Sequence, residues 1–190
     1  MKRFTALFIF VFICMSAYSQ ALAQAELGLK GAGVELGIVG PEDVDATFSF
    51  GAFADLGMIT PDIMLGTYLD YWSQSENLFT GGESTVRDFA FGARGKWIFP
   101  VSNPKVRPFA GAGLGVHFLN FTADVPAQQV GPIITPAFTM EDSSTKIGLD
   151  IGGGVATTVS DRADLIGELW YGFVSDANQL ALKVGFLYKL

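Results

Sequence analysis

The C-terminal stretch, residues 179–190, alternates strictly between two kinds of side chain. One set is wholly apolar, and the other mixes polar, small and charged residues with a single Leu, Leu187. This period-two pattern predicts a β-strand whose two faces meet different environments. The outer edge of such a terminal strand needs a hydrogen-bonding partner, and a sheet that closes on itself supplies one. The apolar set consists of Leu180, Leu182, Val184, Phe186, Tyr188 and Leu190.

Similar alternation recurs along the chain and predicts seven further strands. A strand that crosses a bilayer at the usual tilt needs about 9–11 residues, and each segment is long enough. The sequence therefore predicts an all-β fold, an eight-stranded antiparallel up-and-down transmembrane β-barrel. The expected strands are 26–39, 46–57, 63–74, 86–99, 106–120, 145–158, 163–174 and 179–190. The first of them has Lys30 and Glu35 as polar residues, and its alternation slips phase near Gly31 to Gly33, which suggests a bulge or a weak strand.

The expected connections alternate between short and long, as in outer-membrane barrels, whose extracellular loops are longer than their periplasmic turns. The longest, residues 121–143, contains Pro126, Pro132 and Pro136 and is predicted to be a loop. With the mature N-terminus in the periplasm, the connections after the first, third, fifth and seventh strands would face outside. The 121–143 connection is then the expected contact surface.

One face of the predicted sheet is apolar, and the other carries most of the ionisable strand residues. We expect the apolar face to meet lipid and the charged face to fill the lumen, where the charges would pair with one another. Glu168 and Lys183, for example, are expected to lie diagonally on the hairpin of the last two strands. A soluble lipocalin-like carrier, apolar inside and polar outside, is the alternative. Inward Tyr68, Trp72, Phe109 and Trp170 are expected to fill space beside glycines. The expected inward charges are Lys30, Asp70, Asp88, Arg94, Lys96, Arg107, Asp150, Glu168 and Lys183. The expected interface aromatics are Phe48, Tyr71, Trp97, Phe99, Phe118, Tyr171, Phe173 and Tyr188.

The N-terminus has the features of an export signal. Lys2 and Arg3 precede an apolar run over 4–15, and Ala21-Leu22-Ala23 is a small-residue cleavage site. The run is shorter than the roughly 20 residues of a membrane-spanning helix. We therefore expect residues 1–23 to be a cleaved signal peptide and 24–190 to form the barrel domain. The single cysteine, Cys14, lies in the expected signal, so the exported chain would contain no disulfide.

Composition narrows the classes of partner. The chain has 12 basic and 19 acidic residues, a net charge of −7, which argues against nucleic acid as a ligand. Only 16% of residues are charged, while 23 are Gly and 17 are Phe, a balance that suits a lipid-facing sheet better than a soluble enzyme.

Few residues suggest chemistry. His117, the only histidine, is expected to lie inward, roughly opposite Gly148 and Asp150, and could act as a general base in a lipid-modifying enzyme. Asp70 and Asp88 are expected inward on neighbouring strands and could bind a divalent cation, but pairing with a nearby base is the simpler expectation. The sequence therefore assigns no catalytic, metal-binding or cofactor-binding residue and predicts no cofactor.

The signal sequence, the eight alternating strands and the terminal Phe186-x-Tyr188-x-Leu190 resemble the small OmpA/OmpX-like outer-membrane β-barrel family. The resemblance implies a monomer in the outer membrane, surrounded by lipid and lipopolysaccharide. It also implies that the insertion machinery recognises the terminal strand, 179–190. The implied role is structural or interactive, through the external loops. A lipid-modifying enzyme using His117 and a narrow pore remain as alternatives.

Overall fold

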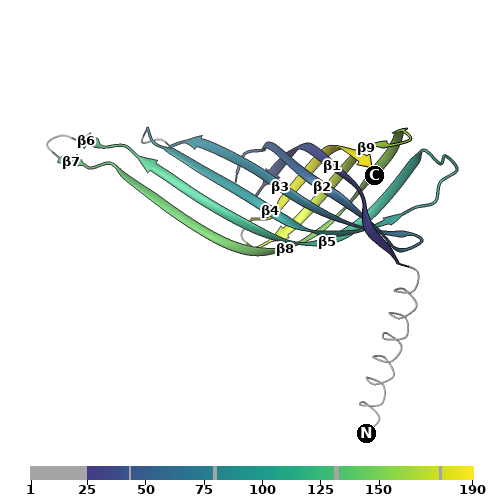
Figure 1. The fold of residues 1–190 in the computed structure, drawn as a ribbon. Helices are drawn as coiled ribbons and strands as arrows, with labels where there is room; N and C mark the ends of the chain where they lie inside the picture. The colour runs from purple at the N-terminus through teal and green to yellow at the C-terminus, as the bar shows by residue number, and fades with distance from the viewer. Residues whose placement is uncertain (1–24, 43, 79–80, 131–132, 176) are drawn as a thin grey trace, which may run out of the picture.

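A computed structural model describes residues 25–42, 44–78, 81–130, 133–175 and 177–190, and within them the chain is almost entirely β-strand (Figure 1). The expected signal peptide, 1–23, lies outside the described residues. No described helix is long and apolar enough to cross a bilayer. The strands are β1 (Glu26–Pro41), β2 (Thr47–Thr60), β3 (Ile63–Asn77), β4 (Glu83–Ile98), β5 (Val106–Val125), β6 (Gln128–Val130), β7 (Ile133–Thr135), β8 (Phe138–Ser160), β9 (Ala163–Val174) and β10 (Gln179–Lys189).

Eight of these strands close into a barrel in the order β1-β10-β9-β8-β5-β4-β3-β2. All neighbours are antiparallel, and β10 closes the ring on β1 from Gly31↔Lys189 to Pro41↔Gln179. The predicted eight-stranded barrel is confirmed. The C-terminal strand thus has a partner along both edges, β1 and β9, as its alternation required.

The barrel places its apolar side chains outside. Alternate residues of β10 are exposed and buried in the predicted order, with Leu182 58% exposed and Lys183 3% exposed. The predicted interface aromatics also face outward, among them Phe48 at 82% and Trp97 at 57% exposure. A lipocalin-like barrel needs the reverse arrangement, so the lumen of this barrel cannot serve as an apolar carrier cavity.

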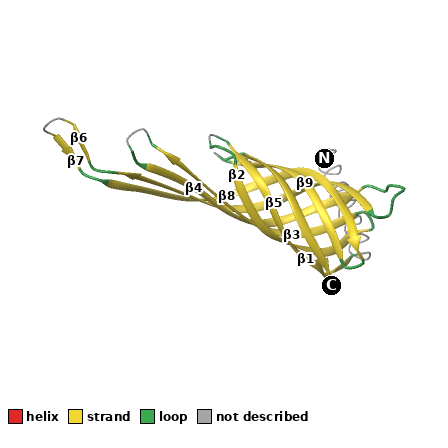
Figure 2. Cartoon of the chain, turned by 90° about the horizontal axis from the view of Figure 1, so that it is seen from above, coloured by secondary structure: helices red, strands yellow, loops and turns green. Residues whose placement is uncertain are grey.

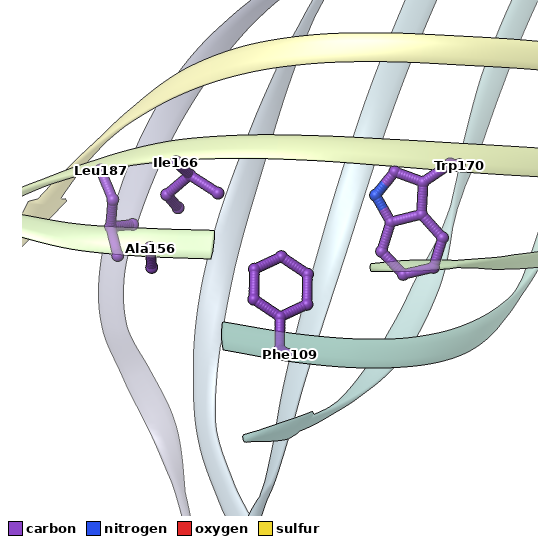
Figure 3. Close-up of a cluster of buried hydrophobic side chains, with 5 residues drawn as sticks. All are labelled: Phe109, Ala156, Ile166, Trp170 and Leu187. Carbon is purple, nitrogen blue, oxygen red and sulfur yellow. The ribbon is translucent and has the colours of Figure 1, made fainter. Parts of the chain in front are cut away.

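The inner surface contains an apolar cluster near the short connections 61–62, 99–105 and 161–162, an end of the barrel that we call the turn end. Figure 3 shows the five side chains of this cluster converging from three neighbouring strands and from β10. The cluster explains the single Leu among the inward residues of β10, because Leu187 is 4% exposed there. Its members are Phe109, Ala156, Ile166, Trp170 and Leu187.

One predicted inward charge is misplaced. Lys30 is exposed, because the β1–β2 register shifts between Leu27 and Gly31 and the alternation changes phase there. A bulge adds a residue to one strand and thereby reverses the faces that follow. The sequence showed the slip near Gly31 to Gly33, but Lys30 was assigned to the wrong side of it. Beyond the bulge, Glu35 points inward and is 4% exposed.

The expected loop at 121–143 is largely strand. β5 continues to Val125, β8 begins at Phe138, and the short pair β6–β7 lies between them. Pro126 and Pro136 interrupt pairing only locally, since 121–125 and 138–143 retain a regular ladder. Four strands therefore extend beyond the other four at the end opposite the turn end, which we call the loop end (Figures 1 and 2). We call this extension, residues 73–77, 83–87, 119–125 and 138–145, the projecting sheet.

Candidate functional site: a filled lumen and a projecting sheet

Glycines in the barrel wall make room for long charged side chains to cross the lumen. Arg94 on β4 reaches Asp150 on β8 over Gly113, which lies between them in the ladder. A Cβ on Gly113 would lie 2.6 Å from the Arg94 Cγ. The glycine runs of β5 and β8 are therefore packing residues, and nothing in their geometry resembles a phosphate-binding loop.

Arg94 is the centre of the lumen's ionic network. Its guanidinium lies 3.1 Å from the Asp150 carboxylate and 3.8 Å from that of Glu168. The guanidinium carbon also lies 3.8 Å from the ring centroid of Tyr68 and 4.3 Å from that of Trp170. Cation–π contacts of this kind add to the ion pairs when water is excluded. The arrangement fixes Arg94 between two aromatic rings and several carboxylates.

Two lysines complete the network. Lys183 Nζ donates to Glu35 at 2.7 Å and to Asp70 at 2.5 Å, and Lys96 Nζ donates to Glu168 at 2.8 Å. Glu168 and Lys183 were expected to lie diagonally, but they are directly opposite in the β9–β10 ladder. The expectation that the inward charges pair with one another is confirmed. Buried ions need such pairing, because an isolated charge in a low-dielectric interior is costly.

The two ends of the lumen have their own pairs. At the turn end, Asp164 is fully buried and accepts hydrogen bonds from Arg107 and Lys189. Toward the loop end, His117 Nδ1 lies 2.8 Å from Asp88 Oδ2. His117 pairs with Lys146 in the ladder and not with the expected Gly148 or Asp150, because the β5–β8 register differs from the one inferred.

The lumen geometry gives little support to a catalytic role for His117. Its side chain is 2% exposed, and its Nε2 lies against Gly148, where an added Cβ would be 2.8 Å away. A lipid substrate could not reach this atom without rearrangement of the wall. Asp70 pairs with Lys183, and Asp88 pairs with His117. Among the described residues, no group of three or more potential metal ligands is present.

The lumen is filled by its own side chains. Two small cavities, of about 30 and 20 Å³, lie on either side of Arg94, which lines both. Each has room for about one water molecule. The predicted filling residues Tyr68, Trp72, Phe109 and Trp170 are all 5% exposed or less. An aqueous channel would require these side chains and Arg94 to move.

The polarity of the wall reverses in the projecting sheet. Within the barrel the outer face is apolar, whereas in the projecting sheet the outer face is wholly polar. The β3–β4, β4–β5 and β5–β8 ladders run through this region without a bulge, so the faces keep their identity. The polar outer face is typical of a sheet surrounded by water. It carries Ser73, Ser75, Asn77, Glu83, Thr85, Arg87, Asn120, Thr122, Asp124, Thr139, Glu141, Ser143 and Thr145.

The inner face of the projecting sheet, which continues the lumen wall, is mainly apolar. Phe121, Phe138 and Met140 are 39%, 47% and 57% exposed. Val86 pairs with Phe121 and Ala123 pairs with Met140, so the apolar residues form one contiguous patch. We call this patch the inner apolar face; its members are Val86, Leu119, Phe121, Ala123, Val125, Phe138 and Met140.

The β8 side of the projecting sheet is an open edge. β9 pairs with β8 only from Gly148 onward, so residues 138–145 have a β5 partner and no described strand on the other side. The direction of the backbone groups of β8 follows from one hydrogen bond, in which the N–H of Thr158 donates to the Lys105 carbonyl on the β5 side. Backbone groups alternate in direction along a strand, and the β5–β8 ladder has no bulge, so the even-numbered residues of β8 face β5. Residues 139, 141, 143 and 145 therefore direct their N–H and C=O groups to the open edge.

A groove of about 530 Å³ lies at the far end of the projecting sheet. Its apolar wall comes from the ends of β5 and β8 and includes Val125 and Phe138. Its acidic wall contains Glu83 and Asp124, whose Oδ1 accepts a hydrogen bond of 2.6 Å from Thr139. The groove therefore combines an apolar surface with two carboxylates.

The sequence matches one protein family over nearly its whole length. The model of the outer membrane protein beta-barrel domain family aligns with residues 6–189. The chain belongs to this family. Membership in the outer membrane protein beta-barrel domain family agrees with the apolar outer wall, the closed ladder and the outer-membrane location inferred from the strand pattern. No curated protein matches the sequence.

Solved structures of low sequence identity share the fold of this family member. Neisserial surface protein A superposes with a TM-score of 0.63 at 17% identity, covering 84% of this chain and 96% of that one. A major outer membrane protein from Thermus thermophilus gives 0.58 at 12% identity, covering 86% and 100%. Ail from Yersinia pestis, in complex with the heparin analogue sucrose octasulfate, gives 0.55 at 12% identity, covering 85% and 100%.

Sequence reasoning found most of the lumen network and missed the inner apolar face and three charged members of the network, Glu35, Asp164 and Lys189. Glu35 was omitted because the strand slips phase before it, although its polar position was noted. Asp164 and Lys189 alternate with the lipid-facing residues of their strands, and that alternation was sufficient to place both of them inward. The reversal of polarity in 121–125 and 138–143 was readable as alternation, but the prolines led to the prediction of a loop.

Proposed function

We propose that this protein is a monomeric outer-membrane anchor that displays the projecting sheet to partners outside the cell. The observation that carries the proposal is the contrast between a filled lumen and an uncovered sheet. Cavities of about 30 and 20 Å³ leave no path for a solute, whereas the projecting sheet offers an open edge and exposed apolar side chains. We infer that the function is contact with a macromolecule, without transport or catalysis.

The proposal includes a path to the membrane. Residues 1–23 act as the export signal, and the insertion machinery recognises the terminal strand, 179–190. The turn end then faces the periplasm and the loop end faces outside, as in barrels with short periplasmic turns. Lipopolysaccharide surrounds the outer half of the wall. The exposed aromatics Phe89 and Phe118, whose ring centroids are 6.2 Å apart, lie just below Arg87 and Asn120 and mark the level of the lipid headgroups.

The open edge suggests one way in which a partner can bind. An extended segment can add to an exposed strand and form main-chain hydrogen bonds with it. The edge over 138–145 has such groups available at alternate residues and carries no proline within that range. Contact along this edge would orient a partner over the inner apolar face.

Single-cysteine labelling of intact cells tests the orientation. Because Cys14 lies in the expected signal, the exported chain has no thiol of its own and an engineered cysteine is the only target. Ala137→Cys, at the loop end, should react with a membrane-impermeant maleimide. The matched variant Ser102→Cys, exposed in the 99–105 connection, should react only after the outer membrane is permeabilised. Labelling of Ser102→Cys alone in intact cells would contradict the proposal.

A further inference from the structure

The inner apolar face and the adjoining groove point to a definite class of partner. We propose that they form a docking surface for a cationic amphipathic segment of another polypeptide. This inference rests on the proposed display of the projecting sheet outside the cell. It adds the chemistry of the partner, which the display alone does not specify.

The inner apolar face needs a partner because its largest side chains lie in contact with water. The polar outer face places this part of the chain above the membrane, where lipid cannot cover Phe121, Phe138 or Met140. No described element packs over these three side chains, which remain 39–57% exposed. Contiguous exposed apolar patches on soluble surfaces commonly mark interaction sites. The surface is therefore suited to the apolar side of an amphipathic segment.

Charge decides which kind of segment fits. Asp142 lies beside Phe121 on the inner face, and Glu76 lies on the same face of β3. Glu83 and Asp124 belong to the outer face, but they also line the groove at the far end, which is lined from both faces. The stretches that form the projecting sheet contain one basic residue, Arg87, on the outer face, and Lys146 follows them on the inner face, nearer the barrel and opposite His117. A partner on the inner apolar face, beyond Lys146, is thus closest to the carboxylates of Asp142 and Glu76, and at the far end it meets those of Glu83 and Asp124.

The same charges disfavour other occupants. A second copy of the chain would present the same carboxylates, Asp142 and Glu76, and like charges brought together across an interface cost several kcal/mol. A sulfated polysaccharide or a lipid phosphate would meet carboxylates as well. A segment with Lys or Arg beside apolar residues gains both from burial and from ion pairing. The groove also suits such side chains, since the apolar stem can contact Phe138 while the charged head reaches Asp124.

Peptide binding to the protein in phosphatidylcholine nanodiscs tests this inference, with empty nanodiscs measured in parallel. The probe is a fluorescent amphipathic peptide made of Leu and Lys, and the control is the same peptide with each Lys replaced by Glu. The Lys peptide should bind the protein more tightly than it binds empty discs. This excess should weaken several-fold as salt rises from about 0.05 M to about 0.5 M, because surface ion pairs are screened. Equal binding of the Glu peptide would overturn the assignment of charge.

Paired variants on opposite faces of the same strands locate the site. Phe121→Ser with Met140→Ser should weaken binding about tenfold or more, since each side chain loses apolar contact. Asp142→Asn should weaken it about threefold, while Glu141→Gln, an equal loss of charge on the outer face, should leave it unchanged. A boiling-dependent gel shift checks that each variant folds. Equal binding by all variants, or no excess of binding over empty discs, would overturn the inference. If Ala137→Cys is still labelled on intact cells in that case, the proposed display of the projecting sheet stands without the inference about its partner.

Discussion

Replacement of Arg94 should destabilise the barrel strongly, because this side chain is the main counter-ion of Asp150. In Arg94→Met, the Asp150 carboxylate, which is 4% exposed, loses its hydrogen bond and ion pair at 3.1 Å. Leaving one partner of a buried pair unneutralised costs about 3–5 kcal/mol. Loss of the contacts with Tyr68 and Trp170 adds about 0.5–2 kcal/mol each. The free energy of unfolding should therefore fall by about 4 kcal/mol or more.

The double variant Arg94→Met with Asp150→Asn distinguishes lost pairing from lost packing. Removing both charges eliminates the unpaired carboxylate, so the double variant should be more stable than Arg94→Met alone by about 1–3 kcal/mol. Arg94→Lys should be intermediate, because an ammonium keeps the charge but loses the planar stack. Arg87→Met is the control: the same substitution on the same strand, at an exposed outer position.

Urea titration of the refolded barrel in detergent, followed by the fluorescence of its tryptophans, measures these differences. Arg87→Met should unfold within about 0.5 kcal/mol of the unchanged chain. If Arg94→Met costs less than about 1 kcal/mol, or if Asp150→Asn adds its full cost to it, the proposed role of the ion pair is wrong.

Three further outcomes follow from the same structure. Gly152→Val should lower the free energy of unfolding by about 1–3 kcal/mol, because its Cβ would lie 2.6 Å from the Trp170 ring, while Gly167→Val, whose Cβ meets nothing within 4 Å, should not lower it. Urea titration compares the two variants, and equal losses of stability would refute the account of the lumen glycines. Planar-bilayer recordings should show no steady conductance for the unchanged chain and an increase for Arg94→Ala, which joins the two cavities; open-channel currents in the unchanged chain would show that the lumen is not filled. In the same titration, Ser143→Pro should destabilise the fold by about 1 kcal/mol less than Ser144→Pro, because only the Ser144 N–H forms a hydrogen bond with β5. The opposite order would show that the open edge is misassigned.

The parts of the fold that sequence predicts well are those in which each strand face has one environment. In β10, lipid lies on one side and the packed lumen on the other, so apolar outward residues alternate regularly with inward residues from Leu180 to Tyr188. The ladder partners are harder, because the period of two fixes a face without fixing the register. This is why His117 was placed opposite Gly148 and why Glu168 and Lys183 were thought to be diagonal.

Where the environment changes along a strand, the same logic gives incomplete answers. β1 changes phase at its bulge, which misplaced Lys30 and hid Glu35. β5 and β8 leave the membrane partway along their length, and from there water lies on the outer side. The pattern after Phe118 thus reverses, but the prolines of 121–143 led to the prediction of a loop there. The candidate docking surface lies in this region, so sequence alone indicated its location and not its form.

Heat-modifiable migration of the chain from an outer-membrane fraction tests the central claim most directly, that the apolar face of a closed barrel meets lipid. Unboiled protein should remain folded in SDS and migrate differently from boiled protein, because each of the eight barrel strands is paired on both sides around the ring. The contradicting result is a chain found soluble in the periplasm, with identical migration before and after boiling.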